Sequence, residues 1–305
     1  MGAGQTQEDG KFSWLRTQDG VRLRAAFWPG RRLRGTVLLL QGRTEYIEKY
    51  HETIGELRAR GFAASAFDWR GQGLSDRALP DRHKGHVRDF AEYHRDMDCF
   101  LDGFVARTAE LPKPYLILAH SMGAHIALRY LHDRPGPFSR AVLCSPMASI
   151  STAPLPPIAA RAIAWVGVKA GMGEAYVPGG RAYEGKRSPF RGNALTHDRT
   201  RFSREAERLR ENPGLALGSP SLGWLDAAFR SIKMLMQPPY CAAISTPALV
   251  IYGSGETVSS PLHQARLAEM LGAGRAECIP GARHEILQET DDIRAQFWAA
   301  FDGFV

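Results

Sequence analysis

The sequence predicts an α/β fold: a mostly parallel sheet, covered by helices on both faces, with a helical cap inserted into it. Two observations lead to this prediction. Short apolar runs alternate with helix-length segments through the first half of the chain and again near its end, as in parallel strands joined by crossover helices. Between these two parts the alternation stops, and proline, glycine and arginine become frequent.

The first part contains the predicted strands and helices in alternation. Residues 20–27 alternate polar and apolar side chains, which is typical of a half-exposed strand. Residues 36–40 are an uninterrupted apolar run, which is typical of a strand buried on both faces. We expect next a helix over 47–60 that stops at Gly61, a strand over 63–67, a helix over 89–109, a strand over 114–119, a helix over 124–132 and a strand over 140–144.

The middle of the chain is the predicted cap. Its clearest element is an arginine-rich helix expected over 198–210. The alternation then returns with a strand over 246–253, a helix over 261–271, a strand over 275–279 and a helix over 290–304. We therefore expect residues 1–147 and 237–305 to form one core and residues 148–236 to form the cap.

Composition narrows the function classes. With 44% hydrophobic and 23% charged residues, the chain is an ordinary globular protein rather than a disordered or coiled-coil one. Its four cysteines stand far apart, so neither a disulfide framework nor a zinc site is predicted. No glycine-rich phosphate loop occurs, and we expect no cofactor and no metal. The N-terminus lacks an apolar leader and no membrane-spanning stretch occurs, so the expected location is the cytoplasm.

The net charge of +7 is concentrated in the predicted cap. Lys and Arg exceed Asp and Glu by 39 to 32 in the whole chain, and most of this surplus lies between Ala148 and Met236. No nucleic-acid motif accompanies it, so nucleic acid is not an expected partner. An anionic substrate, or peripheral contact with an anionic inner membrane face, fits this charge better.

A candidate nucleophile follows the predicted strand that ends near residue 119. In Ala119-His120-Ser121-Met122-Gly123 the residues two before and two after Ser121 are small, as a tight turn between a strand and a helix requires. This pattern alone is weak, and Ala119 stands where glycine is more usual. We expect Ser121 to be exposed at the tip of this turn as a nucleophile.

A serine nucleophile needs a base, and the base needs an orienting acid. Glu256 is the only carboxylate in the loop after the strand over 246–253, and His284 lies in the loop after the strand over 275–279. The chain order of serine, acid and histidine is that of an α/β-type hydrolytic triad. Asp226 and Asp291 are the alternative acids, although neither follows a strand of the sheet.

An oxyanion needs backbone N–H donors. We expect these to come from Met122, directly after the nucleophile, and from Arg43, in the loop after the strand over 36–40. The Arg43 guanidinium is also a candidate for binding a substrate phosphate. His120 and His125 flank the turn and are expected to pack or form hydrogen bonds rather than react.

With these residues, the chain resembles the α/β-hydrolase superfamily, and within it the bacterial lysophospholipase and monoacylglycerol lipase group of serine aminopeptidase-like hydrolases. The resemblance is carried by residues 41–50, 67–75, 83–87, 119–125, 253–256 and 280–285, and it extends from Trp14 to Phe304. Monoacylglycerol lipases usually have His-Gly where this chain has Gln41-Gly42, which favours the lysophospholipase branch. They usually have Asp where this chain has Glu256, which leaves the assignment of the acid open.

The resemblance implies a carboxylic ester hydrolase acting on lysophospholipid or monoacylglycerol through a Ser-His-Glu triad and an acyl-enzyme. A generic carboxylesterase, and an acyltransferase or aminopeptidase of the same fold, share the same residues and stay open. A non-catalytic binding protein is a different class, and the intact triad argues against it. Residues 156–172 of the cap, apolar with Trp165, are candidates to line an acyl pocket or to touch a membrane surface, and ordinary packing of the cap against the core is the third alternative.

Overall fold

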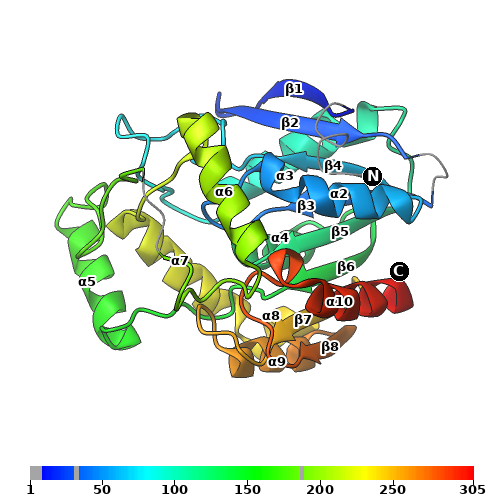
Figure 1. Ribbon diagram of the computed structural model, residues 1–305. Helices are drawn as coiled ribbons and strands as arrows, with labels where there is room; N and C mark the ends of the chain where they lie inside the picture. The colour runs from blue at the N-terminus through cyan, green and yellow to red at the C-terminus, as the bar shows by residue number, and fades with distance from the viewer. Residues whose placement is uncertain (1–8, 31–33, 186–188) are drawn as a thin grey trace.

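The computed structural model describes residues 9–30, 34–185 and 189–305. Their centre is a single eight-stranded sheet in the order β1-β2-β4-β3-β5-β6-β7-β8 (Figure 1). The pairs β1–β2 and β2–β4 are antiparallel and all later pairs are parallel. The strands are β1 (Lys11–Arg16), β2 (Arg22–Trp28), β3 (Thr36–Leu40), β4 (Ala63–Phe67), β5 (Tyr115–His120), β6 (Phe138–Cys144), β7 (Ala248–Gly253) and β8 (Gly274–Ile279). The prediction of a mostly parallel sheet is confirmed.

Helices cover both faces of this sheet. Side chains of β3 alternate between two separate apolar clusters, Leu38 and Leu40 facing one and Val37 and Leu39 the other. The first cluster includes side chains of α3, α4 and α9, and the second includes side chains of α2 and α10. The core helices are η1 (Ile47–Tyr50), α2 (His51–Ala59), α3 (Glu92–Gly103), η2 (Val105–Arg107), α4 (Met122–Asp133), α8 (Pro238–Ala242), α9 (Pro261–Met270), η4 (Ile286–Gln288) and α10 (Asp291–Phe304). Because helices cover both faces of the sheet, the buried parallel strands are continuous apolar runs in the sequence.

Between β6 and β7 the chain leaves the sheet. Before α8, the described residues of this segment form α5 (Pro157–Lys169), α6 (Arg199–Glu211), η3 (Pro213–Leu215) and α7 (Leu222–Leu235), and none of them joins the sheet. Figure 1 shows α5 and α7 to the left of the sheet, with α6 crossing near its end. The cap boundaries at 148 and 236 stay a prediction.

Several predicted elements differ from the structure. The helix expected over 47–60 divides into η1 and α2, and the helix expected over 89–109 is limited to α3 and the short η2. The break between α3 and η2 lies at Phe104, whose φ of −128° is outside the helical region. The edge strand β1 and the helix α7 were absent from the prediction. Among the described residues, no helix is long and apolar enough to cross a membrane.

Candidate active site

Ser121 lies at the sharp turn between β5 and α4. Its φ of 50° is in the left-handed region, which is uncommon for a residue with a side chain. The turn is held because Ser121 N–H donates to the Cys144 carbonyl at the end of β6 at 2.9 Å. A Cβ at Gly123 would lie 2.3 Å from the Leu40 carbonyl oxygen, so only glycine fits two residues after the serine. The local geometry is therefore that of a nucleophile elbow.

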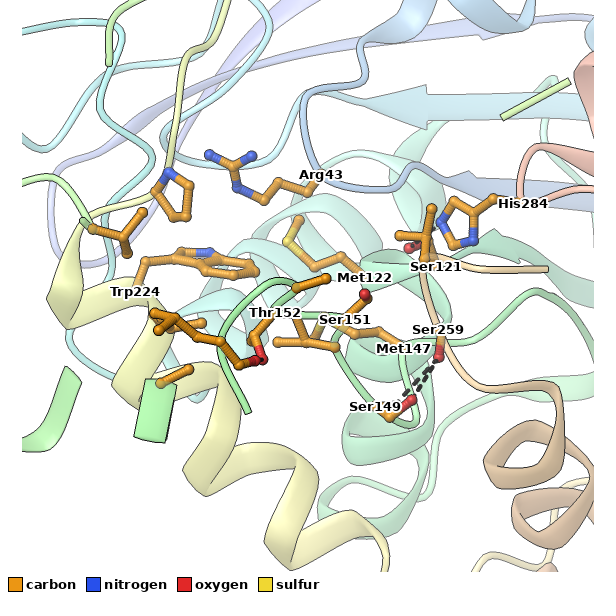
Figure 2. Close-up of a pocket in the computed structure, with 18 of the residues that line it drawn as sticks. Arg43, Ser121, Met122, Met147, Ser149, Ser151, Thr152, Trp224, Ser259 and His284 are labelled. Carbon is orange, nitrogen blue, oxygen red and sulfur yellow. Dashed lines mark hydrogen bonds between the residues drawn. The ribbon is translucent and has the colours of Figure 1, made fainter. Parts of the chain in front are cut away.

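The structure brings Ser121, His284 and Glu256 into one hydrogen-bonded row. Ser121 Oγ lies 3.0 Å from His284 Nε2, and His284 Nδ1 is hydrogen-bonded to Glu256 Oε2. The three residues follow β5, β8 and β7, which are parallel strands whose carboxyl ends meet at one edge of the sheet. Figure 2 shows Ser121 and His284 side by side at one end of a cavity. This is the arrangement in which a histidine can accept a serine proton.

The Glu256 carboxylate is buried and held on both oxygens. Oε1 accepts the backbone N–H groups of Val258 at 2.7 Å and Ser259 at 3.2 Å, which leaves Oε2 for His284. Burial favours the neutral acid, but the hydrogen bond and charge of His284 and the two N–H donors outweigh it, so the pKa of Glu256 is lowered. Glu256 is therefore an ionised acceptor that fixes the ring orientation of His284.

The two alternative acids lie elsewhere. Asp226 is on α7, where it accepts from Arg230 Nε at 2.9 Å. Asp291 begins α10, where it accepts from Arg201 Nη2 at 2.7 Å with most of its side chain exposed. Neither carboxylate is hydrogen-bonded to His284, whereas Glu256 is.

The loop after β3 lies beside the elbow, as expected. Its Gly42 N–H donates to Glu45, and its carbonyl accepts from Gln72 Nε2 at 2.7 Å, so the loop backbone is fixed on both sides. Arg43 from this loop and Met122 at the start of α4 both line the cavity that holds Ser121. Their backbone N–H groups are the oxyanion donors that the sequence predicts.

The Arg43 side chain extends away from the loop into contact with the cap. Its Nη2 donates to the Gly218 carbonyl at 2.7 Å, and the guanidinium carbon lies 5.2 Å from the Trp224 ring centroid. Burial lowers the pKa of Arg43 to about 10, still far above neutrality. Within the described residues, no carboxylate forms a salt bridge with it and its Nε has no hydrogen-bond partner. A buried cation without an anionic partner favours an anionic ligand group.

Two cavities meet at Ser121 and His284. The first, of about 350 Å³, extends under the cap, with Arg43 and Trp224 toward its other end (Figure 2). Its walls are mostly apolar: Met122, Met147, Ile150, Ala153, Leu155, Ala160, Ile163, Val177, Trp224 and Leu225. The second, of about 440 Å³, is more polar and includes Thr44, Glu45, His120, Tyr183, Glu205 and Glu285. The pair can hold an apolar chain on one side of the serine and a polar group on the other.

Sequence reasoning missed a buried group of charged side chains behind the elbow. Lys49 is 3% exposed and lies 2.9 Å from Glu45, 2.7 Å from Glu285 and 3.4 Å from Glu205. The spacing of Glu45 and Lys49 by four residues was an available signal, but a surface pair has the same spacing. In the part of the chain that the structure describes, no group of His, Cys, Asp and Glu side chains is arranged to hold a metal ion.

Comparisons with known proteins identify the family of the chain. The family model described as serine aminopeptidase, S33, matches residues 31–291. The probable lysophospholipase L2 of Haemophilus influenzae is 31% identical over 277 residues, covering 91% of this chain and 85% of the relative. Lysophospholipase L2 of Escherichia coli K12 is 32% identical over 270 residues, covering 85% of this chain and 76% of the relative. A soluble variant of monoglyceride lipase from Saccharomyces cerevisiae, solved with a substrate analog, superposes with a TM-score of 0.77 at 20% identity, covering 96% and 93%.

Proposed function

Since the chain belongs to the serine aminopeptidase, S33, family and is a carboxylic ester hydrolase, we propose that it releases fatty acid from lysophospholipids, with monoacylglycerols as the second candidate. The observation that carries this proposal is the position of Ser121 and His284 where an apolar and a polar cavity meet. A lipid with one acyl chain has these two halves on either side of its ester bond. The lysophospholipase and monoglyceride lipase names of the relatives support the same substrate class.

In the proposed reaction, Ser121 Oγ attacks the ester carbonyl while His284 Nε2 takes its proton. Glu256 holds the imidazole in the correct tautomer and stabilises the imidazolium. The N–H groups of Met122 and Arg43 stabilise the oxyanion of the tetrahedral intermediate. His284 then gives the proton to the departing alcohol, leaving the fatty acyl group on Ser121. A water molecule, deprotonated by His284, hydrolyses this acyl-enzyme and restores the serine.

The two cavities suit the two halves of the substrate. Met147, Ile150 and Leu225 belong to the apolar wall that would contact the acyl chain. Burying apolar chain surface there contributes roughly 25 cal/mol per Å². Thr44 and Tyr183 line the other cavity, where their hydroxyl groups can form hydrogen bonds with the glycerol moiety.

Arg43 favours a phosphate-bearing substrate over a neutral one. Its guanidinium is buried at the cavity wall and has no carboxylate partner among the described residues. Arg43 lines the polar cavity as well as the apolar one, so a phosphodiester in the polar cavity would supply the missing negative charge through charge-assisted hydrogen bonds. This contact separates lysophospholipid from monoacylglycerol, which share the rest of the site.

The exposed face of α5 supports peripheral contact with an anionic membrane surface. Ile158 is 85% exposed and Trp165 is 54% exposed, and the cations Arg161 and Lys169 lie on the same helix. Exposed apolar side chains flanked by cations are the pattern of helices that lie in a membrane interface. Ile163 is both exposed and part of the apolar cavity wall, so the cavity opens beside this face.

The test compares fatty-acid release from lysophosphatidylcholine, monoacylglycerol and a short chromogenic ester, with an aminoacyl anilide for the aminopeptidase alternative. Ser121→Ala is the inactive variant, and Ser139→Ala, on an exposed part of β6, is the matched control. Release from lysophospholipid that is lost only in Ser121→Ala supports the proposal. Activity on the short ester alone would favour a generic esterase, and activity on the anilide would favour an aminopeptidase.

Membrane contact is tested by sedimentation with vesicles of phosphatidylglycerol or of phosphatidylcholine. We expect stronger binding to the anionic vesicles, and weaker binding after Trp165→Ser. Leu262→Ser, away from the cap on α9 and with a side chain that is 76% exposed, is the control. Equal binding of all three proteins to both vesicles, or no binding to either, would exclude this contact.

A further inference from the structure

His120, the residue before the nucleophile, has a hydrogen-bond partner at each ring nitrogen. It is 3% exposed and lies at the end of β5. Its Nδ1 is 3.0 Å from Glu45 Oε2, and its Nε2 is 3.1 Å from the backbone carbonyl oxygen of His284. The ring therefore connects the oxyanion loop to the loop that carries the candidate base.

The chemistry of these two partners determines which ring nitrogens carry hydrogen. A backbone carbonyl oxygen only accepts, so Nε2 of His120 must be protonated to form its bond. The Glu45 carboxylate already receives the Gly42 N–H, the Tyr50 hydroxyl at 2.6 Å and the Lys49 ammonium at 2.9 Å. A carboxylate with three such donors is ionised and acts as an acceptor, so Nδ1 must be protonated as well.

We propose that His120 is a doubly protonated imidazolium at neutral pH, and that it is a positioning residue which holds the His284 loop against the oxyanion loop. One bond fixes the backbone of His284, whose ring must face Ser121. The other bond joins the carboxylate that also fixes Gly42. The protonation state stands by itself, whereas the positioning role rests on the proposed ester hydrolysis at Ser121.

The surroundings of His120 favour its charged form. Burial opposes the charge, but the negative charge and hydrogen bond of Glu45 outweigh it with help from Glu285, so the pKa of His120 is raised. Burial also acts on Glu45, yet the cations His120 and Lys49 hold the pKa of that carboxyl well below its usual range. The other titratable or charged groups around this pair are Lys49 and Tyr50 of η1, Cys144 of β6, Glu205 of α6, and His284 and Glu285 of the loop after β8.

His125, on the other side of the elbow, is the natural comparison. It is equally buried, with Nδ1 at 3.0 Å from the Met147 carbonyl and Nε2 at 2.6 Å from Ser231 Oγ. A hydroxyl can donate as well as accept, so a neutral ring satisfies both partners. Burial lowers the pKa of His125 to about 3. Two buried histidines around one nucleophile therefore have opposite protonation states.

Nitrogen-15 NMR of the histidine-labelled protein measures the protonation directly. At pH 7 we expect both ring nitrogens of His120 to be protonated and only one of those of His125, with His120→Gln and His125→Gln assigning the signals among the ten histidines. We also expect Glu45→Gln to convert His120 to a neutral ring. A neutral His120 in the wild-type protein, or one that stays charged in Glu45→Gln, would overturn the proposal.

Kinetics test the positioning role. In His120→Gln we expect kcat to fall about 10- to 100-fold with little change in KM, because a small displacement of reacting groups has effects of this order. We expect the decline of wild-type kcat at alkaline pH, where His120 loses its proton, to be absent in this variant. His125→Gln is the matched control, with no such change in the pH profile.

An unchanged kcat and pH profile in His120→Gln would overturn the positioning role. If the wild-type protein hydrolyses no ester at all, the proposed function fails, while the NMR result still decides the protonation state. If His120→Gln does not fold, Glu45→Gln provides both the NMR and the kinetic readout. In Glu45→Gln we expect the decline of kcat at alkaline pH to shift to lower pH.

Discussion

Glu256→Gln tests the orienting acid because the structure dictates how the new amide must sit. Oε1 of Glu256 accepts two backbone N–H groups, from Val258 at 2.7 Å and Ser259 at 3.2 Å. The amide oxygen of glutamine must take this position, since an amide NH₂ there would face two donors. The NH₂ group is then placed opposite His284 Nδ1. It donates to Nδ1 and forces the proton onto Nε2, where the ring cannot accept the proton of Ser121.

The expected loss follows from this change of tautomer. The corresponding acid-to-amide replacement in a serine protease triad lowers kcat about 10⁴-fold. A loss of this size equals about 5.5 kcal/mol of transition-state stabilisation. The assay is steady-state hydrolysis of the short chromogenic ester and of lysophosphatidylcholine, with the circular dichroism spectrum as a check on folding. Because the defect is in proton acceptance, we expect kcat to fall on both substrates alike.

Two control variants separate the orienting role from a general disturbance. Glu256→Asp keeps an acceptor that is one methylene shorter, and we expect a smaller loss than in Glu256→Gln. Glu269→Gln changes an exposed acid on α9 and should leave activity unchanged. A folded Glu256→Gln protein that keeps kcat within tenfold of the wild type would refute the reasoning.

Three further predictions concern packing, substrate choice and pH. Gly123→Ala places a Cβ 2.3 Å from the Leu40 carbonyl oxygen, so we expect a loss of about 1–3 kcal/mol in the free energy of unfolding. Urea denaturation measures this loss, and an unchanged midpoint of the unfolding transition would contradict the prediction. Arg43→Gln should lower kcat/KM for lysophospholipid about 10- to 100-fold more than for monoacylglycerol, because a hydrogen bond to a charged group contributes a binding free energy of this size. Equal losses of kcat/KM on both substrates would exclude a phosphate contact. The pKa of His120 is raised in the folded protein, so the protonated ring stabilises the fold. This contribution is complete below the ordinary histidine pKa of 6.5 and is lost as pH rises through the raised pKa. The free energy of unfolding should therefore decline on the alkaline side more in the wild-type protein than in His120→Gln, and parallel curves would contradict this.

The parallel core could be predicted well because its strands are buried on both faces. β3 and β4 have the predicted bounds, Thr36–Leu40 and Ala63–Phe67, since every residue of these runs is apolar or small and none contacts solvent. The candidate triad could be assembled for a related reason. The carboxyl ends of parallel strands lie at one edge, so residues after β5, β7 and β8 must come together.

The missed elements depend on contacts that local sequence does not encode. β1 is an edge strand with Trp14 56% exposed, and its register is set by antiparallel pairing with β2. α7 had local signals, with Ser221 capping it through the Trp224 N–H, but they lie within a segment otherwise rich in proline and glycine. His120 was expected to have only a packing or hydrogen-bonding role. Its charge follows from Glu45, 75 residues away, and His284, 164 residues away.

The meeting of two cavities at Ser121 also has a consequence for the sequence of events in one turnover. In the proposed reaction, the acyl chain attached to the serine occupies the apolar cavity. In the same scheme, the alcohol half leaves from the polar cavity, and this space admits the water that attacks the acyl-enzyme. The fatty acid can leave only after this attack. The proposed reaction therefore has an order in which the alcohol departs first and the acid last, and in this scheme water and alcohol share the polar cavity.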